Sequence, residues 1–295
     1  MLPPNLCDNE GSRIQSACRA RLRVVFIALA LAQGGLTARA NAADYIPIAA
    51  NMFTSVMAND AASSAIPGVS ASALARVASF EMRETPVTNG EYLTFVKSNR
   101  KWQLGKVPSV FADRGYLSRW SASTTLGADA GPNQPVTNVS WFAAQAFCES
   151  EGARLPTWLE WELVAAADSS VKDARADPAW RAVILKWYSQ PSTGSLPDVG
   201  GTANAYGVRN MHGLIWEWVD DFNALLVAAD SRNQGDPDKL QFCGAGAISL
   251  KDRDNYAVLM RIALLSSLSA VDSTRNLGFR CARSTNHVNQ TEVNK

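Results

Sequence analysis

Four short segments rich in aromatic, acidic and small residues most constrain the fold of this chain. They are residues 84–95 (ETPVTNGEYLTF), 135–162 (PVTNVSWFAAQAFCESEGARLPTWLEWE), 204–221 (NAYGVRNMHGLIWEWVDD) and 276–282 (NLGFRCA). Five of the nine tryptophans lie in them: Trp141, Trp158, Trp161, Trp216 and Trp218. Tryptophan buries a large area, and its ring N–H needs a partner. The segments therefore predict a compact, loop-rich fold held by aromatic anchors, with sugar stacking as the alternative role of these rings.

The charge of the chain is close to balance. It has 28 basic and 27 acidic residues among 295, so it lacks the charge excess of a protein that binds nucleic acid or a membrane surface. Its length allows one large domain or two small ones. A hydrophobic content of 47% is ample for a core. We therefore expect a globular protein without a nucleic-acid partner.

The N-terminus has the pattern of a secretory signal peptide. Three arginines within residues 19–23 precede an apolar run over residues 24–32, and two A-x-A sites follow within residues 38–42. The apolar run is too short to span a bilayer. We therefore expect cleavage near Ala40 or Ala42, a periplasmic or secreted protein, and no membrane span after cleavage.

The patterns after residue 42 predict one α+β domain of low regular secondary structure. We assign residues 1–42 to the signal peptide, 43–79 to an N-terminal leader strand and loop, 80–284 to the domain and 285–295 to a flexible tail. Helix start signals predict helices that run from Thr88 or Asn89 to Lys97, from Ser140 to Gly152, from Thr157 to about Ala167, and from Asp177 to Tyr188. Short strands are expected at residues 80–85 and 278–283 and in much of the remainder.

Together the four segments resemble the formylglycine-generating-enzyme domain, also called the sulfatase-modifying factor domain. The resemblance implies a C-type-lectin-like architecture. It also implies a disulfide between Cys148, before the RLPT segment, and Cys281 in the GFRCA segment. Export supplies the oxidising compartment in which such a bond forms. Because Cys7 and Cys18 leave with the signal peptide, Cys243 remains, either as an inert buried thiol or as a reactive or metal-binding one.

Two acidic motifs allow more than one interpretation. In RLPTWLEWE, Glu160 and Glu162 are either an acid–base pair or residues that begin a helix and hold the fold, and the resemblance implies the second.

The segment MHGLIWEWVDD resembles one that holds calcium through oxygen ligands in the family. Glu217 matches that segment, although Leu214 stands where the family has asparagine. The candidate calcium ligands are Glu217, Asp220 and Asp221.

The histidine and cysteine counts bear on the metal chemistry of the superfamily. Its sulfoxide synthases hold iron with three histidines, and this chain has only His212 and His287, so three-histidine iron is excluded. The family holds copper(I) with a C-x4-C pair about twenty residues before GFRCA, because copper(I) prefers soft thiolates. Asp252 and Ala257 stand at these positions and residues 244–267 contain no cysteine, so copper is not expected. The remaining catalytic candidates are Cys243 and Ser249.

These features predict an exported member of the family that lacks sulfatase-activating oxidase chemistry and acts as an accessory or binding factor, with enzyme activity left open. It resembles exported members that accompany copper-dependent respiratory enzymes such as nitrite reductase. The charges at Lys251, Asp252, Arg253 and Asp254 predict either a groove that recognises an exported protein partner or a solvated turn before a buried strand over residues 258–265. The alternatives are a copper-dependent oxidase of a protein cysteine with a rearranged site, and a calcium-dependent carbohydrate-binding module.

Overall fold

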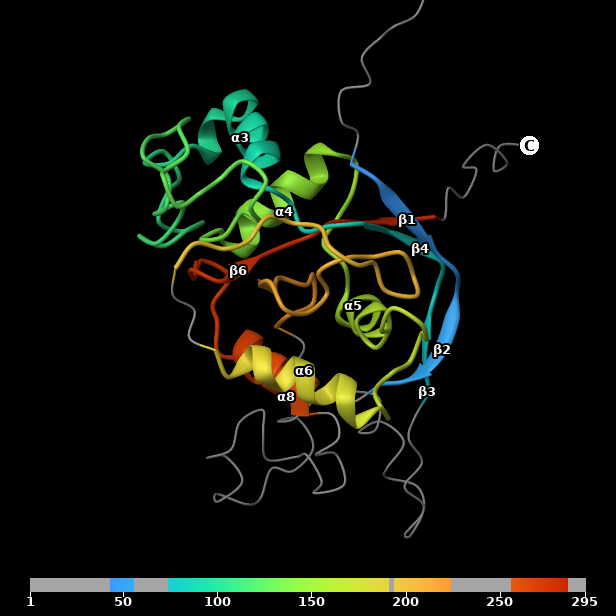
Figure 1. Ribbon diagram of the computed structural model, residues 1–295. Coiled ribbons are helices and arrows are strands. Elements are labelled where there is room, and N and C mark those ends of the chain that lie inside the picture. The colour runs from blue at the N-terminus through green and yellow to red at the C-terminus, as the bar shows by residue number, and fades with distance from the viewer. Residues whose placement is uncertain (1–42, 56–73, 191–193, 224–255, 286–295) are drawn as a thin grey trace, which may run out of the picture. The chain divides into compact units, whose positions relative to one another are not determined.

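Short strands bring the two ends of the domain into one sheet. The computed structural model describes residues 43–55, 74–190, 194–223 and 256–285 (Figure 1). An antiparallel sheet has the order β1-β4-β7 and consists of β1 (Tyr45–Ile48), β4 (Phe80–Arg83) and β7 (Ala282–Ser284). Phe80 and Met82, two positions apart on β4, are both buried, because every second side chain of a strand points to the same face. The middle strand of this sheet therefore anchors the core.

Two further pairs of strands complete the sheet structure of the described residues. β2 (Asn51–Thr54) pairs antiparallel with β3 (Leu74–Val77), and β5 (Trp216–Glu217) pairs parallel with β6 (Leu277–Gly278). A Cβ atom on Gly278 would lie 2.2 Å from the carbonyl oxygen of Val136, so only glycine fits there. The leader over residues 43–79 thus contributes three strands where one was expected, since Phe53 and Val77 are buried as well.

Side-chain caps begin each of the four predicted helices and confirm where they start. Two helices begin with a capping box: α3 (Asn89–Ser98) with Thr88 and Glu91, and α5 (Trp158–Ala165) with Thr157 and Glu160. The other two have a single side-chain cap, which is Ser140 for α4 (Trp141–Ser150) and Asp177 for α6 (Pro178–Tyr188). Such caps satisfy backbone N–H groups that have no partner inside the helix. A short 3-10 helix, η1 (Arg100–Trp102), follows α3. α5 ends two residues earlier than expected, where the N–H of Ala167 turns back to the carbonyl of Val164.

The last helix corrects the expectation of a buried strand over residues 258–265. These residues belong to α8 (Tyr256–Ser266), which lies beside α6 (Figure 1). Alanine, leucine, methionine and arginine are strong helix formers. Arg261, Ile262 and Leu265 are buried while Met260 is exposed, which is the spacing of one helix face. A short apolar run does not distinguish a strand from a helix, and tertiary packing decides the outcome here.

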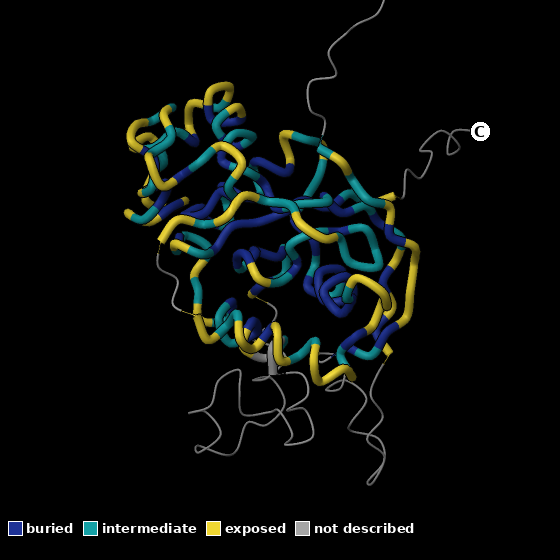
Figure 2. Tube along the Cα trace, in the orientation of Figure 1, coloured by how far each residue is buried: buried dark blue, intermediate teal, exposed yellow. Residues whose placement is uncertain are grey.

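The core is unusually aromatic. Tyr92 on α3 stacks on Phe147 of α4 with ring centroids 5.7 Å apart, and Phe279 packs edge-on against both. α5 lies inside the molecule, with every residue except Leu159 buried (Figure 2). Among the described residues, no helix has the length and apolar content needed to cross a membrane. The aromatic segments of the sequence thus supply the packing around which the loops are arranged.

Candidate functional site

The carboxylates at the start of α5 hold the fold. Glu160 accepts two hydrogen bonds from Arg154, at 2.7 Å and 2.6 Å, and a third from the backbone N–H of Thr157. Glu162 accepts from the indole N–H of Trp158 at 2.9 Å and from the hydroxyl of Ser55 at 2.6 Å. Both carboxylates thus have structural partners, in agreement with the second interpretation of this motif.

A buried ion pair lies where the third and fourth sequence segments meet. β5 and β6 run in parallel and place Glu217 beside Gly278. The guanidinium of Arg280 donates to both oxygens of Glu217, at 2.8 Å and 2.9 Å, and the indole N–H of Trp161 donates to the same carboxylate at 2.8 Å. The side chains of Glu217 and Arg280 are both 0% exposed. Burying two charges is tolerated when they are paired and hydrogen-bonded in this way.

Arg261 of α8 brings a second buried guanidinium to this ion pair. It lies over the ring of Trp161, 3.5 Å from the ring centroid, and donates to the backbone carbonyl of Glu217. Burial lowers the pKa of Arg261 to about 10, although the nearby Glu217 carboxylate acts in the opposite direction and raises this pKa. Arg280 binds the same carboxylate, so within the described part of the chain the two arginines share one opposing charge. The aromatic face and the carbonyl stabilise the second cation.

His212 is enclosed between two tryptophans. Its ring lies edge-on to Trp161 and Trp180, with centroids 5.7 Å and 5.6 Å away, and its Nε2 lies 2.8 Å from the carbonyl oxygen of Ala165. Since a carbonyl only accepts, Nε2 carries the proton. Burial lowers the pKa of His212 to about 4, with smaller effects from Arg261, Glu217 and Arg280. This histidine is therefore neutral near pH 7 and serves the packing.

His212 should make the stability of the protein depend on pH. In the unfolded chain it binds a proton below about pH 6.5, but in the folded protein only below about pH 4. The unfolded state gains the proton first, so the free energy of unfolding should fall by about 1 to 3 kcal/mol as the pH drops through this window. Urea denaturation at several pH values measures this. His212→Gln should flatten the dependence and His287→Gln should leave it unchanged; equal profiles for wild type and His212→Gln would contradict the prediction.

The candidate calcium ligands do not converge. Glu217 is occupied by Arg280 and Trp161, while Asp221 accepts the backbone N–H of Trp158 at 2.7 Å and so caps α5. Burial raises the pKa of both Asp220 and Asp221. Across residues 43–55, 74–190, 194–223 and 256–285, no group of three or more histidine, cysteine or acidic side chains is placed to hold a metal ion. The carboxylates of Glu217 and Asp221 thus already have partners within the protein, and a calcium role for Glu217, Asp220 and Asp221 stays a prediction.

A groove of about 250 Å³ lies beside the ion pair. It is lined by Arg119, Trp187, Tyr188, Gln190, residues 194–197, Gly213, Leu214, Trp216, Arg275 and Asn276. Tyr188, at the end of α6, stacks on Trp216 of β5 with centroids 4.7 Å apart and an angle of 4° between the rings. The ring of Trp187 also packs against Trp216, tilted, with the ring centroids 5.5 Å apart. The end of α6 and the start of β5 thus build a half-buried aromatic wall, and we call this site the aromatic groove.

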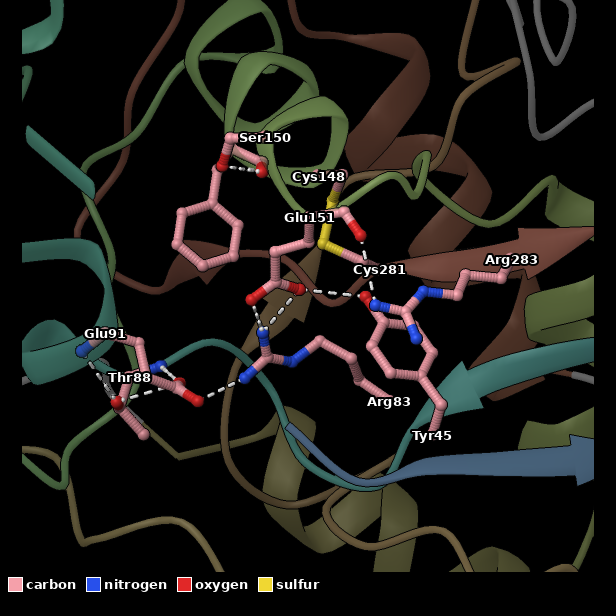
Figure 3. Close-up of polar contacts among 10 residues, drawn as sticks. Tyr45, Arg83, Thr88, Glu91, Cys148, Ser150, Glu151, Cys281 and Arg283 are labelled. Atoms are coloured by element: carbon pink, nitrogen blue, oxygen red, sulfur yellow. Dashed lines mark hydrogen bonds and ion pairs between the residues drawn. A yellow bond between two sulfur atoms is a disulfide. The ribbon is translucent and has the colours of Figure 1, made fainter. Parts of the chain in front are cut away.

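The disulfide lies next to a cluster of charges (Figure 3). It joins Cys148 of α4 to Cys281, with an S–S distance of 2.01 Å, and is the pairing that the resemblance implies. Beside it, Glu151 accepts from Arg83 at 2.8 Å and 2.9 Å and from the hydroxyl of Tyr45 at 2.9 Å. These contacts tie β1 and β4 to the end of α4, so this cluster supports the fold.

Several sequence candidates lie outside the described residues. They are Cys243, Ser249, Lys251, Asp252, Arg253 and Asp254, together with the expected signal peptide over residues 1–42. Their roles remain predictions.

Comparison with known proteins identifies the family. The profile of the sulfatase-modifying factor enzyme 1-like domain matches residues 36–285. The chain belongs to this family. The helices, short strands and low regular content described above agree with that fold, which the four sequence segments had indicated. The further likeness to C-type lectins remains a prediction.

Several relatives that the chain matches are oxidases. The hercynine oxygenase of Mycobacterium tuberculosis is 30% identical over 167 residues, covering 48% of this chain and 37% of that protein. The formylglycine-generating enzyme of Streptomyces coelicolor is 33% identical over 174 residues, covering 51% and 53%. The chain therefore spans about half or less of the length of these relatives. Among solved structures, PvdO from Pseudomonas aeruginosa aligns with 81% of this chain and 94% of its own, at 18% identity and a TM-score of 0.42.

Four arginines of the site were missed by sequence reasoning. Arg280 and Arg261 each stand alone among apolar residues, in NLGFRCA and in the run over residues 258–265. A single charge inside an apolar stretch that belongs to the core signals a buried partner, and that signal was present for both. Arg119 and Arg275 lie in loops without periodicity, so no sequence pattern indicated that they line the same groove.

Proposed function

We propose that this protein is a member of the family that lacks formylglycine-generating oxidase chemistry and acts as a binding or accessory factor. One observation carries the proposal. Cys148 and Cys281 are bonded to each other, and Cys243 is the one other cysteine after residue 42. A single thiolate cannot form the two-thiolate site that copper(I) prefers. Without that site, nothing holds the metal beside a substrate sulfur.

The aromatic groove is the place where we expect binding. Its lining includes Trp216 and Asn276, which belong to two of the four segments that resemble the family. Aromatic side chains with nearby polar groups are typical of ligand sites. The described lining residues include no buried nucleophile next to a base, and His212 is neutral and enclosed, so this lining suits recognition rather than group transfer.

Export is part of the same proposal. The N-terminal pattern supports a signal peptide cleaved after Ala40 or Ala42, and a disulfide favours an oxidising compartment. A companion role to a copper-dependent respiratory enzyme in that compartment follows from the resemblance to exported members of the family. Sequencing the N-terminus of protein recovered from the exported fraction tests this part: a start at Asn41 or Ala43 supports it, and an intact Met1 opposes it.

The decisive test of the lost oxidase chemistry is an activity assay. The mature protein, with and without copper, should leave the cysteine of a C-x-P-x-R peptide unchanged, because proximity of metal and substrate carries much of such a reaction's acceleration. Mass spectrometry of the peptide measures the conversion to formylglycine. The formylglycine-generating enzyme of Streptomyces coelicolor serves as the positive control.

The runner-up is a copper-dependent oxidase with a rearranged site at Cys243. Turnover by the wild type that disappears in the Cys243→Ser variant would establish this activity and overturn the proposal. Turnover that persists in Cys243→Ser would overturn it as well, and would place the chemistry elsewhere.

A further inference from the structure

Two arginines dominate the charge of the aromatic groove. Arg119 and Arg275 line it, and its described lining residues include no aspartate or glutamate. Burial lowers the pKa of Arg119, and the nearby Arg275 lowers it further. Two like charges at a partly buried site raise each other's energy. The groove is therefore most stable with a negative charge in it.

The protein orients these two guanidinium groups without neutralising them inside the groove. Arg119 donates through Nη2 to the backbone carbonyl of Asp129, while its Nε is buried and has no hydrogen-bond partner. Arg275 donates through Nη2 to the carbonyl of Gly194 at 3.3 Å. Carbonyl groups fix the position of an arginine but carry no net charge. The carboxylate of Asp129 raises the pKa of Arg119, but Asp129 is not one of the residues that line the groove.

A third arginine contributes positive charge from behind the aromatic wall. Burial raises the pKa of Tyr188 to about 12, and the nearby Arg261 opposes that shift. Glu217, the carboxylate that acts on Arg261 among the described residues, is also bound by Arg280. Low-dielectric walls focus such a field into a cleft. The groove thus combines an apolar wall with positive potential.

We propose that the aromatic groove binds an extended acidic segment of a protein partner. Carboxylates of the segment pair with Arg119 and Arg275, and an adjacent apolar side chain packs against Trp187, Tyr188 and Trp216. Guanidinium forks match carboxylates in geometry and charge, and tryptophan, tyrosine and arginine dominate protein interfaces. The inference rests on the proposed function, because it assigns a ligand class to the groove of a binding factor.

The size and aromatic geometry of the groove favour a peptide. At about 250 Å³ it is slightly smaller than the usual pocket for a small molecule, about 300–1,000 Å³, and it suits a short stretch of chain. Tyr188 and Trp216 each use one ring face on the other. A sugar ring needs an open aromatic face as its platform, so this stacked pair suits side-chain packing better.

Peptides that differ only in charge test the proposal. The probe is a fluorescein-labelled hexapeptide of alternating glutamate and proline, and the control peptide has glutamine in place of glutamate. Fluorescence anisotropy should show binding of the acidic peptide alone, weakened by salt because exposed charges are screened. Arg275→Gln should weaken it about tenfold. Arg275→Glu should abolish it and favour a lysine–proline peptide instead.

The matched control is Arg100→Gln, which removes an exposed arginine outside the groove and should leave binding unchanged. Arg275 is the residue chosen for substitution because it is exposed, so its replacement should not disturb the core. Circular dichroism with thermal unfolding verifies that each variant folds. Equal binding of acidic and neutral peptides, or equal losses in Arg275→Gln and Arg100→Gln, would overturn the proposal. Binding of an oligoglucuronate without binding of the peptide would overturn the peptide assignment.

The two proposals fail in different ways. Turnover of the C-x-P-x-R peptide removes the non-oxidase function, whatever the acidic hexapeptide does. Absence of charge-dependent hexapeptide binding, together with absence of turnover, removes the acidic ligand and leaves the binding-factor proposal in place.

Discussion

The double variant Cys148→Ala/Cys281→Ala should lose about 4 to 5 kcal/mol of free energy of unfolding, because a cross-link restricts the unfolded chain more as the loop it closes becomes longer. The two cysteines are 133 positions apart, so the loop is long. Such a loss is a large share of the total stability of a typical domain, roughly 5 to 15 kcal/mol. Urea denaturation of wild type and variant, both without reductant, measures it.

Cys243→Ser is the control for this experiment. It should retain both the stability and the disulfide of the wild type, since the bond joins Cys148 to Cys281. Non-reducing peptide mapping verifies the bond in each protein. A Cys243→Ser variant that has lost its disulfide would show that Cys243 takes part, and the pairing described above would then be wrong.

Breaking the buried ion pair should have a comparable effect. Glu217→Gln removes the carboxylate that Arg280 and Arg261 face among the described residues, and removing one partner of a buried pair costs about 3 to 5 kcal/mol. Arg280→Met should be similarly harmful, because it leaves the Glu217 carboxylate with the indole N–H of Trp161 as its remaining side-chain donor among the described residues. Urea denaturation again gives the difference in free energy of unfolding.

Glu84→Gln provides the matched control, since it makes the same chemical change in a more accessible pair. Glu84 lies 2.5 Å from Arg209, and the two side chains are 27% and 35% exposed. A partly exposed pair contributes up to about 1 kcal/mol, so this variant should remain close to the wild type. If Glu217→Gln is no more destabilised than Glu84→Gln, the ion pair does not hold the core together.

Local signals in the sequence predicted much of the fold. Thr88 or Asn89, Ser140, Thr157 and Asp177 were predicted to begin helices because a short polar side chain at a helix start satisfies free N–H groups. In the structure the caps are Thr88, Ser140, Thr157 and Asp177. The family follows from the four segments, and the profile match over residues 36–285 confirms it. These features depend on a few neighbouring residues, so one sequence suffices.

Features that depend on distant residues were not predicted. α8 was expected as a strand because an apolar run has no periodicity of its own to decide the matter. The ion pair of Glu217 was not predicted because its partner Arg280 lies 63 positions away. The aromatic groove unites Arg119, Tyr188, Trp216 and Arg275 from four separate parts of the chain, and no spacing rule connects them.

The closure of the sheet by β7 has a consequence for how the chain folds. Arg280 donates to the carbonyl of Glu84, 196 positions earlier, and β4 in the middle of the sheet has no neighbour on one side until β7 arrives. Proteins rich in such distant pairings fold slowly, because the entropy of a long loop must be lost before the contacts form. During synthesis from the N-terminus, the sheet would thus lack one of its three strands until residues 282–284 had left the ribosome.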